Sequence, residues 1–269
     1  MTPDKNLFVQ QALEIARKAL EKGELPIAPV ARVRASERPK IHYPVLCQHP
    51  CALEGKDSVL ERIHQAGVIG IFRVDRPENC LRAMEALMEG GLNVFEVTTT
   101  TPQATELITD ARRKYGQKAL VGIGTVLDGQ TAEKGIDAGA QFVVSPSLHK
   151  DVLDACKSHG VVSCPGTFSA TEIVQAWRWG ADLIKVFPVS QVGPGYISSM
   201  LGPLPWVRLV PTGGVDAENA GSYIRAGAYA LGVGGALVSK KAISEGRYGS
   251  LTEAARAILQ EVKIAREGS

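Results

Sequence analysis

The chain has 269 residues, of which 45% are hydrophobic, and its formal net charge is +2 at pH 7. This composition is typical of a globular protein with a large core, and the near-neutral charge gives no reason to expect a nucleic-acid partner. No apolar run approaches the roughly 18 residues of a membrane span, and the N-terminus lacks the hydrophobic segment of a signal peptide. We therefore expect a cytoplasmic protein that does not enter the membrane.

The first part of the chain, residues 1–55, differs in character from the rest. Apolar residues recur at helical spacing over residues 8–19, whereas residues 26–50 are rich in proline and arginine and show no periodicity. This pattern predicts a helix followed by an irregular arm. Its acidic residues argue against a transit peptide, although plastid targeting stays open as an alternative, and the pattern assigns the extension no role.

The N-terminal extension also contains the only closely spaced cysteine pair of the chain. Cys47 and Cys51 are separated by three residues, with His42 and His49 nearby. No second cysteine pair follows, as a structural zinc site would need. We interpret these cysteines as reduced thiols and predict that the protein holds no metal.

From residue 56 onward, short apolar runs recur at regular spacing. Most intervals between them have the apolar spacing of a helix; residues 79–87, for example, are followed by the helix stop Gly90-Gly91. Strands that alternate with helices pair in parallel, so residues 56–269 predict an α/β domain, a (β/α)8 TIM barrel, with a doubly wound open sheet as the alternative. The predicted strands are Val68–Phe72, Val94–Val97, Leu120–Ile123, Phe142–Val144, Val161–Cys164, Leu183–Phe187, Val207–Val210 and Ala230–Val233.

The sixth predicted strand contains a lysine, Lys185, and stops at Pro188. Burial disfavours the charged ammonium form of a lysine, and a neutral lysine amine attacks ketones to form Schiff bases. A lysine in an apolar strand is therefore a candidate nucleophile. The alternative is a lysine near a strand end whose stem packs on apolar groups while its amine reaches water.

A second charged residue, Glu96, lies in the second predicted strand. Because side chains alternate along a strand, Lys185 shares a face with Phe187, and Glu96 shares a face with Thr98. Both faces of a barrel strand are apolar, so a charge on the inner face needs a partner or a chemical role. The two residues are candidates for a catalytic pair, with a purely structural ion pair as the alternative.

Glycines gather where the last two predicted strands end. The seventh strand runs into Thr212-Gly213-Gly214, and the eighth runs into Gly234-Gly235. The active sites of (β/α)8 barrels lie at the C-terminal ends of the strands, and phosphate sites often use these two loops. Glycine lets backbone N–H groups approach an oxyanion, although glycines can equally serve only to make tight turns.

Six segments of the predicted barrel follow one another in the order found in a known family. They are Glu96-Val97-Thr98, Gly122-Ile123-Gly124-Thr125-Val126-Leu127, Phe142-Val143-Val144-Ser145-Pro146, Cys164-Pro165-Gly166, Ile184-Lys185-Val186-Phe187-Pro188 and Pro211-Thr212-Gly213-Gly214-Val215. On these segments, residues from about 58 to 265 resemble the 2-keto-3-deoxy-6-phosphogluconate (KDPG) aldolases, also called KDPG/KHG aldolases.

The resemblance implies a class I aldolase of the Entner–Doudoroff type that forms pyruvate and glyceraldehyde 3-phosphate, uses no metal or other cofactor, and assembles as a homotrimer. It implies that Lys185 forms the Schiff base and that Glu96 is the general acid and base, with a pKa raised by burial. The substrate-binding residues that it implies are Arg73 and Thr125 for the pyruvate carboxylate, Thr98 and Pro146 nearby, Phe187 against the pyruvyl group, and Thr212, Gly213, Gly214, Gly234 and Gly235 for the phosphate.

Two positions depart from the family pattern. Thr100 stands where some members carry a carboxylate-binding arginine, whereas Arg73 matches the arginine that other members have at the end of the first strand. Gly235 stands where many members have serine, and a lost hydrogen bond to a charged group costs about 1.5–3 kcal/mol, so strict dependence on the phosphate is in question.

Three alternatives stay open at the level of sequence. One is a related 2-keto-3-deoxy sugar acid or 4-hydroxy-2-oxoglutarate aldolase. Another is a barrel that binds a phosphorylated ligand without turnover, and a third, on fold alone, is a phosphosugar isomerase. The sequence does not decide the stereochemistry of the substrate at C4.

Overall fold

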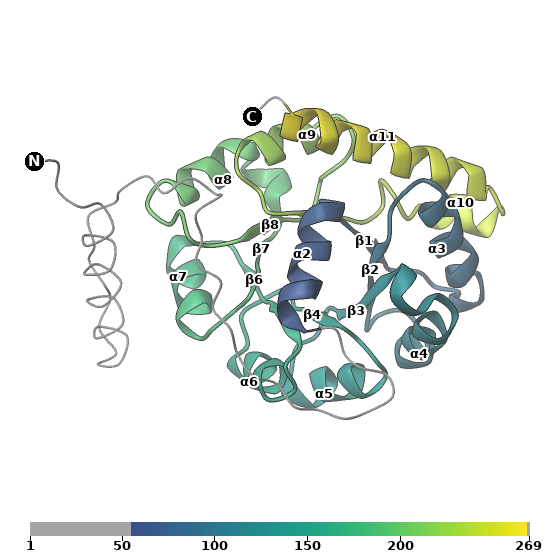
Figure 1. Cartoon of the computed structure of the whole chain (residues 1–269), viewed down its shortest axis with the longest axis horizontal. Coiled ribbons are helices and arrows are strands. Elements are labelled where there is room, and N and C mark those ends of the chain that lie inside the picture. The colour runs from purple at the N-terminus through teal and green to yellow at the C-terminus, as the bar shows by residue number, and fades with distance from the viewer. Residues whose placement is uncertain (1–54, 268–269) are drawn as a thin grey trace, which may run out of the picture. The chain divides into compact units, whose positions relative to one another are not determined.

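The computed structural model describes residues 55–267 of the chain (Figure 1). Apart from its last residue, the predicted N-terminal extension, residues 1–55, lies outside the described residues, and so does the Cys47 and Cys51 pair. Within residues 55–267, no helix is long and apolar enough to cross a lipid bilayer.

Parallel strands form a closed barrel in this part of the chain. One sheet has the order β5-β4-β3-β2-β1-β9 and the other the order β6-β7-β8. The chain passes from β5 into β6 through Pro165, and a bridge between Thr212 and Gly232 joins β8 to β9, so the ring closes. The strands are β1 (Val68–Phe72), β2 (Val94–Thr98), β3 (Leu120–Gly124), β4 (Phe142–Val144), β5 (Val162–Cys164), β6 (Gly166–Thr167), β7 (Ile184–Val186), β8 (Leu209–Pro211) and β9 (Leu231–Val233).

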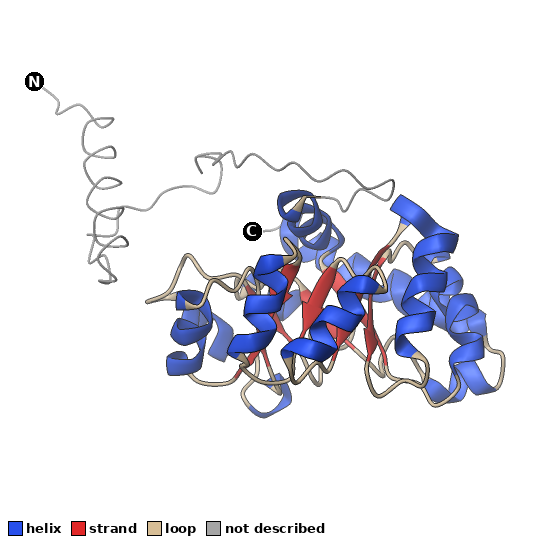
Figure 2. Cartoon of the chain, turned by 90° about the horizontal axis from the view of Figure 1, so that it is seen from below, coloured by secondary structure: helices blue, strands red, loops and turns tan. Residues whose placement is uncertain are grey.

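Helices connect successive strands, apart from β5 and β6, and surround the barrel, as Figure 2 shows in a side view. This arrangement confirms the predicted (β/α)8 class, because each parallel pair needs a crossover on the outside of the sheet. The helices are α2 (Lys56–Ala66), α3 (Cys80–Glu89), α4 (Ala104–Tyr115), α5 (Gly129–Asp137), α6 (Lys150–Ser158), α7 (Ala170–Arg178), α8 (Pro194–Leu201), α9 (Ala220–Arg225), α10 (Lys240–Ser244) and α11 (Tyr248–Glu267), with short 3₁₀ turns at Pro77–Asn79, Gly116–Lys118 and Val189–Gln191.

Side chains alternate between two apolar cores along the strands. On β2, Val94 belongs to the core inside the barrel, and Phe95 belongs to the core between strands and helices. Helix α2 adds Val59, Leu60 and Ile63 to the inner core, and Figure 1 shows this helix lying across the ring of strands. Because Val94 is the first residue of β2, α2 closes the end of the barrel at which the strands begin.

Two predicted strands differ from the observed ones, whereas the others agree to within a residue at either end. The predicted strand Val161–Cys164 is followed by a further strand, β6, because Pro165 has no N–H to donate and interrupts the hydrogen-bonded ladder only locally. The strand predicted at Val207–Val210 is observed as β8, which begins two residues later, at Leu209. Val207 instead belongs to the preceding turn, because its N–H donates a hydrogen bond to the carbonyl of Leu204 (3.3 Å).

An ion pair anchors α2 to the barrel. Lys56 Nζ lies 2.8 Å from Asp182 Oδ2, which also accepts hydrogen bonds from the backbone N–H and the hydroxyl of Ser163, each at 2.9 Å. Asp182→Ala leaves these donors unpaired, so we expect the free energy of unfolding in urea to fall by about 2–3 kcal/mol. The control is Asp154→Ala, which removes an exposed pair with Lys150 and should cost less than about 0.5 kcal/mol; equal losses would contradict the prediction.

Candidate active site

Lys185 is the central residue of β7, and its side chain faces the inside of the barrel. Its neighbours Ile184 and Val186 belong to the outer core, so alternation directs Lys185 inward. Only 5% of the residue is exposed. Neighbouring strand β6 fixes its backbone, because the Lys185 carbonyl accepts a hydrogen bond from the hydroxyl of Thr167 (3.0 Å). The structure therefore places this lysine in the interior, as the strand pattern predicts.

Glu96 occupies the same interior from β2 and is 2% exposed. Among the described residues, its Oε1 atom has no hydrogen-bond partner. Space for the carboxylate comes from β3, which pairs with β2 so that Thr98 lies opposite Gly124. A Cβ atom at Gly124 would overlap the carboxylate of Glu96. The position of Glu96 thus depends on a glycine of the next strand.

The charges of the site act on one another without forming a direct ion pair. Burial raises the pKa of the Glu96 carboxyl above its ordinary value of 4.5, as predicted, while the positive charges of Lys185 and Arg73 act in the opposite direction. No hydrogen bond or ion pair within 4.0 Å joins Glu96 to Lys185 among residues 55–267, so the structure does not contain the structural ion pair that the sequence left open. The Lys185 ammonium nitrogen lies 5.0 Å from the centre of the Phe187 ring.

The raised pKa of Glu96 makes the stability of the barrel depend on pH. Because the folded state binds this proton more tightly than the unfolded state, stability falls as the pH rises from 4.5 through the folded-state pKa. Glu96→Gln removes the titration, so we expect its free energy of unfolding to vary less with pH over this range and to exceed that of the wild type at pH 7. Urea denaturation at several pH values measures this difference. Glu133→Gln, at an exposed position, is the control, and the same flattening in both variants would contradict the assignment.

Other predicted site residues stand where the strands end. Arg73 directly follows β1 and is exposed, and its positive charge acts to lower the pKa of Glu96. Thr98, the last residue of β2, is fully buried, and its hydroxyl donates to the backbone rather than facing an open space. Thr125 follows β3, is half-buried and has a φ of 60°. Pro146 follows β4 and is also half-buried.

The two glycine turns adjoin each other because β8 and β9 are neighbours in the barrel. Gly213 and Gly214 have φ values of 88° and 83°, a conformation that favours glycine. In the described part of the chain, no hydrogen bond uses the backbone N–H groups of Gly213, Gly214, Gly234 or Gly235. A Cβ atom at Gly213 would lie 3.1 Å from the Phe187 ring, so this turn contacts the strand that carries Lys185. These N–H groups are suited to bind an anion.

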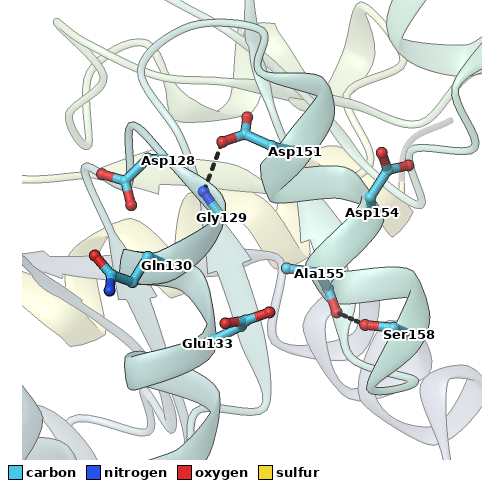
Figure 3. Close-up of a pocket in the computed structure, with 8 residues that line it drawn as sticks. All are labelled: Asp128, Gly129, Gln130, Glu133, Asp151, Asp154, Ala155 and Ser158. Atoms are coloured by element: carbon cyan, nitrogen blue, oxygen red, sulfur yellow. Dashed lines mark hydrogen bonds between the residues drawn. The ribbon is translucent and has the colours of Figure 1, made fainter.

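A wide hollow on the surface is lined by none of these residues (Figure 3). It lies between α5 and α6, where Asp151 accepts a hydrogen bond from the N–H of Gly129 (2.8 Å). Four acidic side chains line it, so it is unsuited to a carboxylate or phosphate ligand. Within the described residues, no group of three or more His, Cys, Asp or Glu side chains is placed to hold a metal ion. The acidic residues of the hollow are Asp128, Glu133, Asp151 and Asp154.

Comparison with known sequences decides the family of this barrel. Residues 59–254 match the sequence model of the KDPG and KHG aldolases. The chain belongs to this family. The matched segment contains the strands that carry Glu96 and Lys185 and both glycine turns. The part of the chain that matches the family is therefore the part that forms the candidate site.

Relatives and solved structures agree with this membership. The chain is 35% identical, over 209 residues, to the 2-dehydro-3-deoxy-phosphogluconate aldolase of Treponema pallidum, which covers 77% of this chain and 99% of the relative. It is 34% identical, over 168 residues, to the 2-dehydro-3-deoxy-6-phosphogalactonate aldolase of Escherichia coli, covering 62% and 82% of the two chains. The structure of the Legionella pneumophila KDPG aldolase, with pyruvate captured as a covalent carbinolamine, superposes with a TM-score of 0.69 at 28% identity over 74% of this chain and 97% of that one.

Family membership confirms the enzyme class that the sequence predicts. The protein is an aldolase, a carbon–carbon lyase. Lys185 and Glu96 were predicted from the sequence because charged residues stand out in apolar strands. The space that Gly124 leaves for Glu96 was not predicted, because this close approach arises only when β2 and β3 pair.

Proposed function

We propose that this enzyme cleaves 2-keto-3-deoxy-6-phosphogluconate into pyruvate and glyceraldehyde 3-phosphate through a Schiff base on Lys185. The observation that carries the proposal is a buried lysine and a buried carboxylate on the inner face of one barrel, in a chain of the KDPG/KHG aldolase family. A purely structural pair explains this arrangement less well, because burying two charges is costly and no direct ion pair offsets the cost.

The reaction follows from the chemistry of the two side chains. The Lys185 amine attacks the C2 ketone in its unprotonated form, and uptake of one proton with loss of water gives the protonated imine. A base takes the proton of the C4 hydroxyl, the C3–C4 bond breaks, and its electrons move to the imine nitrogen. Glyceraldehyde 3-phosphate leaves, and protonation of the enamine at C3 and hydrolysis of the imine release pyruvate and restore the amine. Glu96, with a pKa raised by burial, exchanges these protons directly or through a water molecule.

The remaining residues bind the two ends of the substrate in this proposal. Arg73 supplies positive charge for the pyruvate carboxylate, and Thr125 supplies a hydroxyl. Phe187 packs on the pyruvyl group, with Thr98 and Pro146 at the edge of the site. The phosphate is bound by the unused N–H groups of Gly213, Gly214, Gly234 and Gly235. Thr212 leads into the first of these turns, and its own N–H and hydroxyl donate to the carbonyls of Val186 (2.9 Å) and Val210 (3.3 Å).

The proposal extends to the organisation of the protein. The lysine provides the electron sink, so the reaction needs no metal or other cofactor. We assign residues 56–269 to the aldolase barrel and residues 1–55 to an extension of its own. A homotrimer in the cytoplasm is the assembly and location that we expect.

The decisive test combines mass spectrometry with kinetics. After reaction with pyruvate and borohydride, the intact protein is expected to carry one reduced pyruvyl adduct, which peptide mapping places on Lys185. Cleavage of the phosphogluconate substrate is measured by coupling pyruvate formation to lactate dehydrogenase. A folded protein that forms no adduct would overturn the Schiff-base mechanism.

A second substrate is suggested by one of the relatives. The Escherichia coli relative, 34% identical to this chain, is named for the phosphogalactonate substrate, which differs from the phosphogluconate in stereochemistry at C4. The unphosphorylated 4-hydroxy-2-oxoglutarate is a third substrate to test, because Gly235 offers only an N–H group. Comparing kcat/KM for the three compounds in the same coupled assay decides among them.

A further inference from the structure

Four consecutive threonines, Thr98 to Thr101, end β2 and lead toward α4. The first of them follows Glu96 by two residues, and within residues 55–267 no hydrogen bond joins any of the four to Glu96. Their hydroxyls instead reach the segments that follow the two neighbouring strands, β1 and β3. We refer to these residues as the threonine run.

On one side, the threonine run holds the backbone on both sides of Arg73. The Thr98 hydroxyl donates to the carbonyl of Phe72 (3.0 Å), and the Thr101 hydroxyl donates to the same carbonyl (3.2 Å). Thr101 Oγ1 also accepts a hydrogen bond from the N–H of Val74 (3.3 Å). Because Thr101 bonds the residues before and after Arg73, it fixes the direction in which the arginine leaves the strand.

On the other side, the run holds Thr125. The Thr99 hydroxyl donates to the carbonyl of Thr125 (2.9 Å), and the Thr99 N–H donates to the carbonyl of Gly124 (2.8 Å). Thr125 has a φ of 60°, which is unfavourable for a β-branched residue and persists only where surrounding contacts impose it. Thr99 supplies such a contact at that residue.

The hydroxyl protons of the run are all accounted for. A hydroxyl has one proton to donate, and those of Thr98 and Thr101 go to the carbonyl of Phe72, which has two lone pairs. Thr100 therefore donates to Thr98 across their 2.9 Å contact. Thr98 and Thr101 are 0% and 2% exposed, so water does not replace these bonds.

We propose that the threonine run is a positioning element that holds Arg73 and Thr125 in one fixed arrangement for the carboxylate of the substrate. This inference rests on the proposed function, in which these two residues bind that carboxylate. Thr99 and Thr101 are the positioning residues, and neither touches substrate. Buried hydrogen bonds to backbone groups keep such a binding pair from relaxing apart, which preserves affinity at low entropic cost.

The test uses Thr101→Val, which keeps the shape of the side chain and removes its hydroxyl. The pyruvate concentration that gives half-maximal borohydride-trapped adduct is expected to rise by about three- to tenfold, the effect of one hydrogen bond, while the adduct yield at saturating pyruvate stays at the wild-type level. Thr101→Ser restores the hydroxyl and is expected to return the half-saturation value toward that of the wild type. Thr99→Val removes the hydrogen bond to Thr125 instead, and it is also expected to raise the pyruvate concentration at half-saturation.

The matched control is Thr252→Val. Thr252 is also buried, and its hydroxyl also donates to a backbone carbonyl, that of Ala86 (2.8 Å), but it lies on α11 and its partner lies on α3. This variant is expected to lose stability without any change in half-saturation by pyruvate.

Each outcome of the experiment bears on the proposal. Unchanged half-saturation in both Thr101→Val and Thr99→Val, with the wild type forming the adduct, overturns the positioning role alone. If the wild type forms no adduct, the proposed function fails and the positioning role fails with it. If Thr101→Val does not fold, the half-saturation value of Thr99→Val decides the question: a value equal to that of the wild type overturns the positioning role.

Discussion

Replacement of Lys185 by methionine is expected to reduce aldol cleavage to the rate of the uncatalysed reaction. Methionine keeps an unbranched chain of the same length as lysine out to Cε but offers no amine, so neither the imine nor the electron sink that breaks the C3–C4 bond can form. Because the side chain is 95% shielded from solvent in an apolar strand, an uncharged replacement is expected to leave the free energy of unfolding unchanged or higher. The coupled pyruvate assay and urea denaturation measure the two effects.

The control for this variant is Lys157→Met on the exposed surface of α6, which should retain full activity. Lys185→Met is also expected to form no pyruvyl adduct with borohydride. Measurable turnover in Lys185→Met would refute the Schiff-base assignment and favour a barrel that acts on a phosphorylated ligand by other chemistry.

The second large effect is expected from Gly124→Ala. The added methyl group would overlap the Glu96 carboxylate, so Glu96 must rotate away or β3 must shift. Loss of a positioned general acid–base group lowers rates by about 10²–10⁴-fold, and we expect kcat to fall within this range. The lysine stays in place, so the variant should still form the pyruvyl adduct when borohydride is present.

Two comparisons make this prediction specific. Gly249→Ala, at a glycine where a methyl group meets no atom within 4 Å, is expected to retain wild-type kcat. Glu96→Gln should reproduce the kinetic defect of Gly124→Ala, and combining the two changes should add little to either, since both act on one carboxylate. Normal kcat in Gly124→Ala would show that Glu96 does not need its observed position.

Much of the fold was predictable because its signals are local. Apolar runs such as Val68–Phe72 and Phe142–Val144 form the observed strands β1 and β4, since burial on both faces requires apolar residues at successive positions. Lys185 and Glu96 were recognisable for the same reason, as charges inside such runs. The motif order then predicted the family, which the match over residues 59–254 confirms.

Other features were not predictable from local pattern. Helix α2 has the spacing of any amphipathic helix, and no residue in it indicates that it lies across one end of the barrel. Strand β6 has only two residues and follows a proline, so its pattern does not distinguish it from a loop. The resemblance places Thr98 near the pyruvate carboxylate, whereas the hydrogen bond from its hydroxyl to the carbonyl of Phe72 depends on the pairing of β1 with β2.

The sequence by itself determined which segments become strands, apart from β6, that one lysine and one carboxylate lie inside the barrel, and that glycine turns follow the last two strands. Only the tertiary structure decided that Gly124 makes room for Glu96 and that Thr101 bonds Val74, 27 residues away in the chain. The physical reason is that the spacing of apolar residues along the chain reflects only which side chains are buried and which are exposed. Contacts between distant residues depend on strand register, which is set by the packing of the whole barrel.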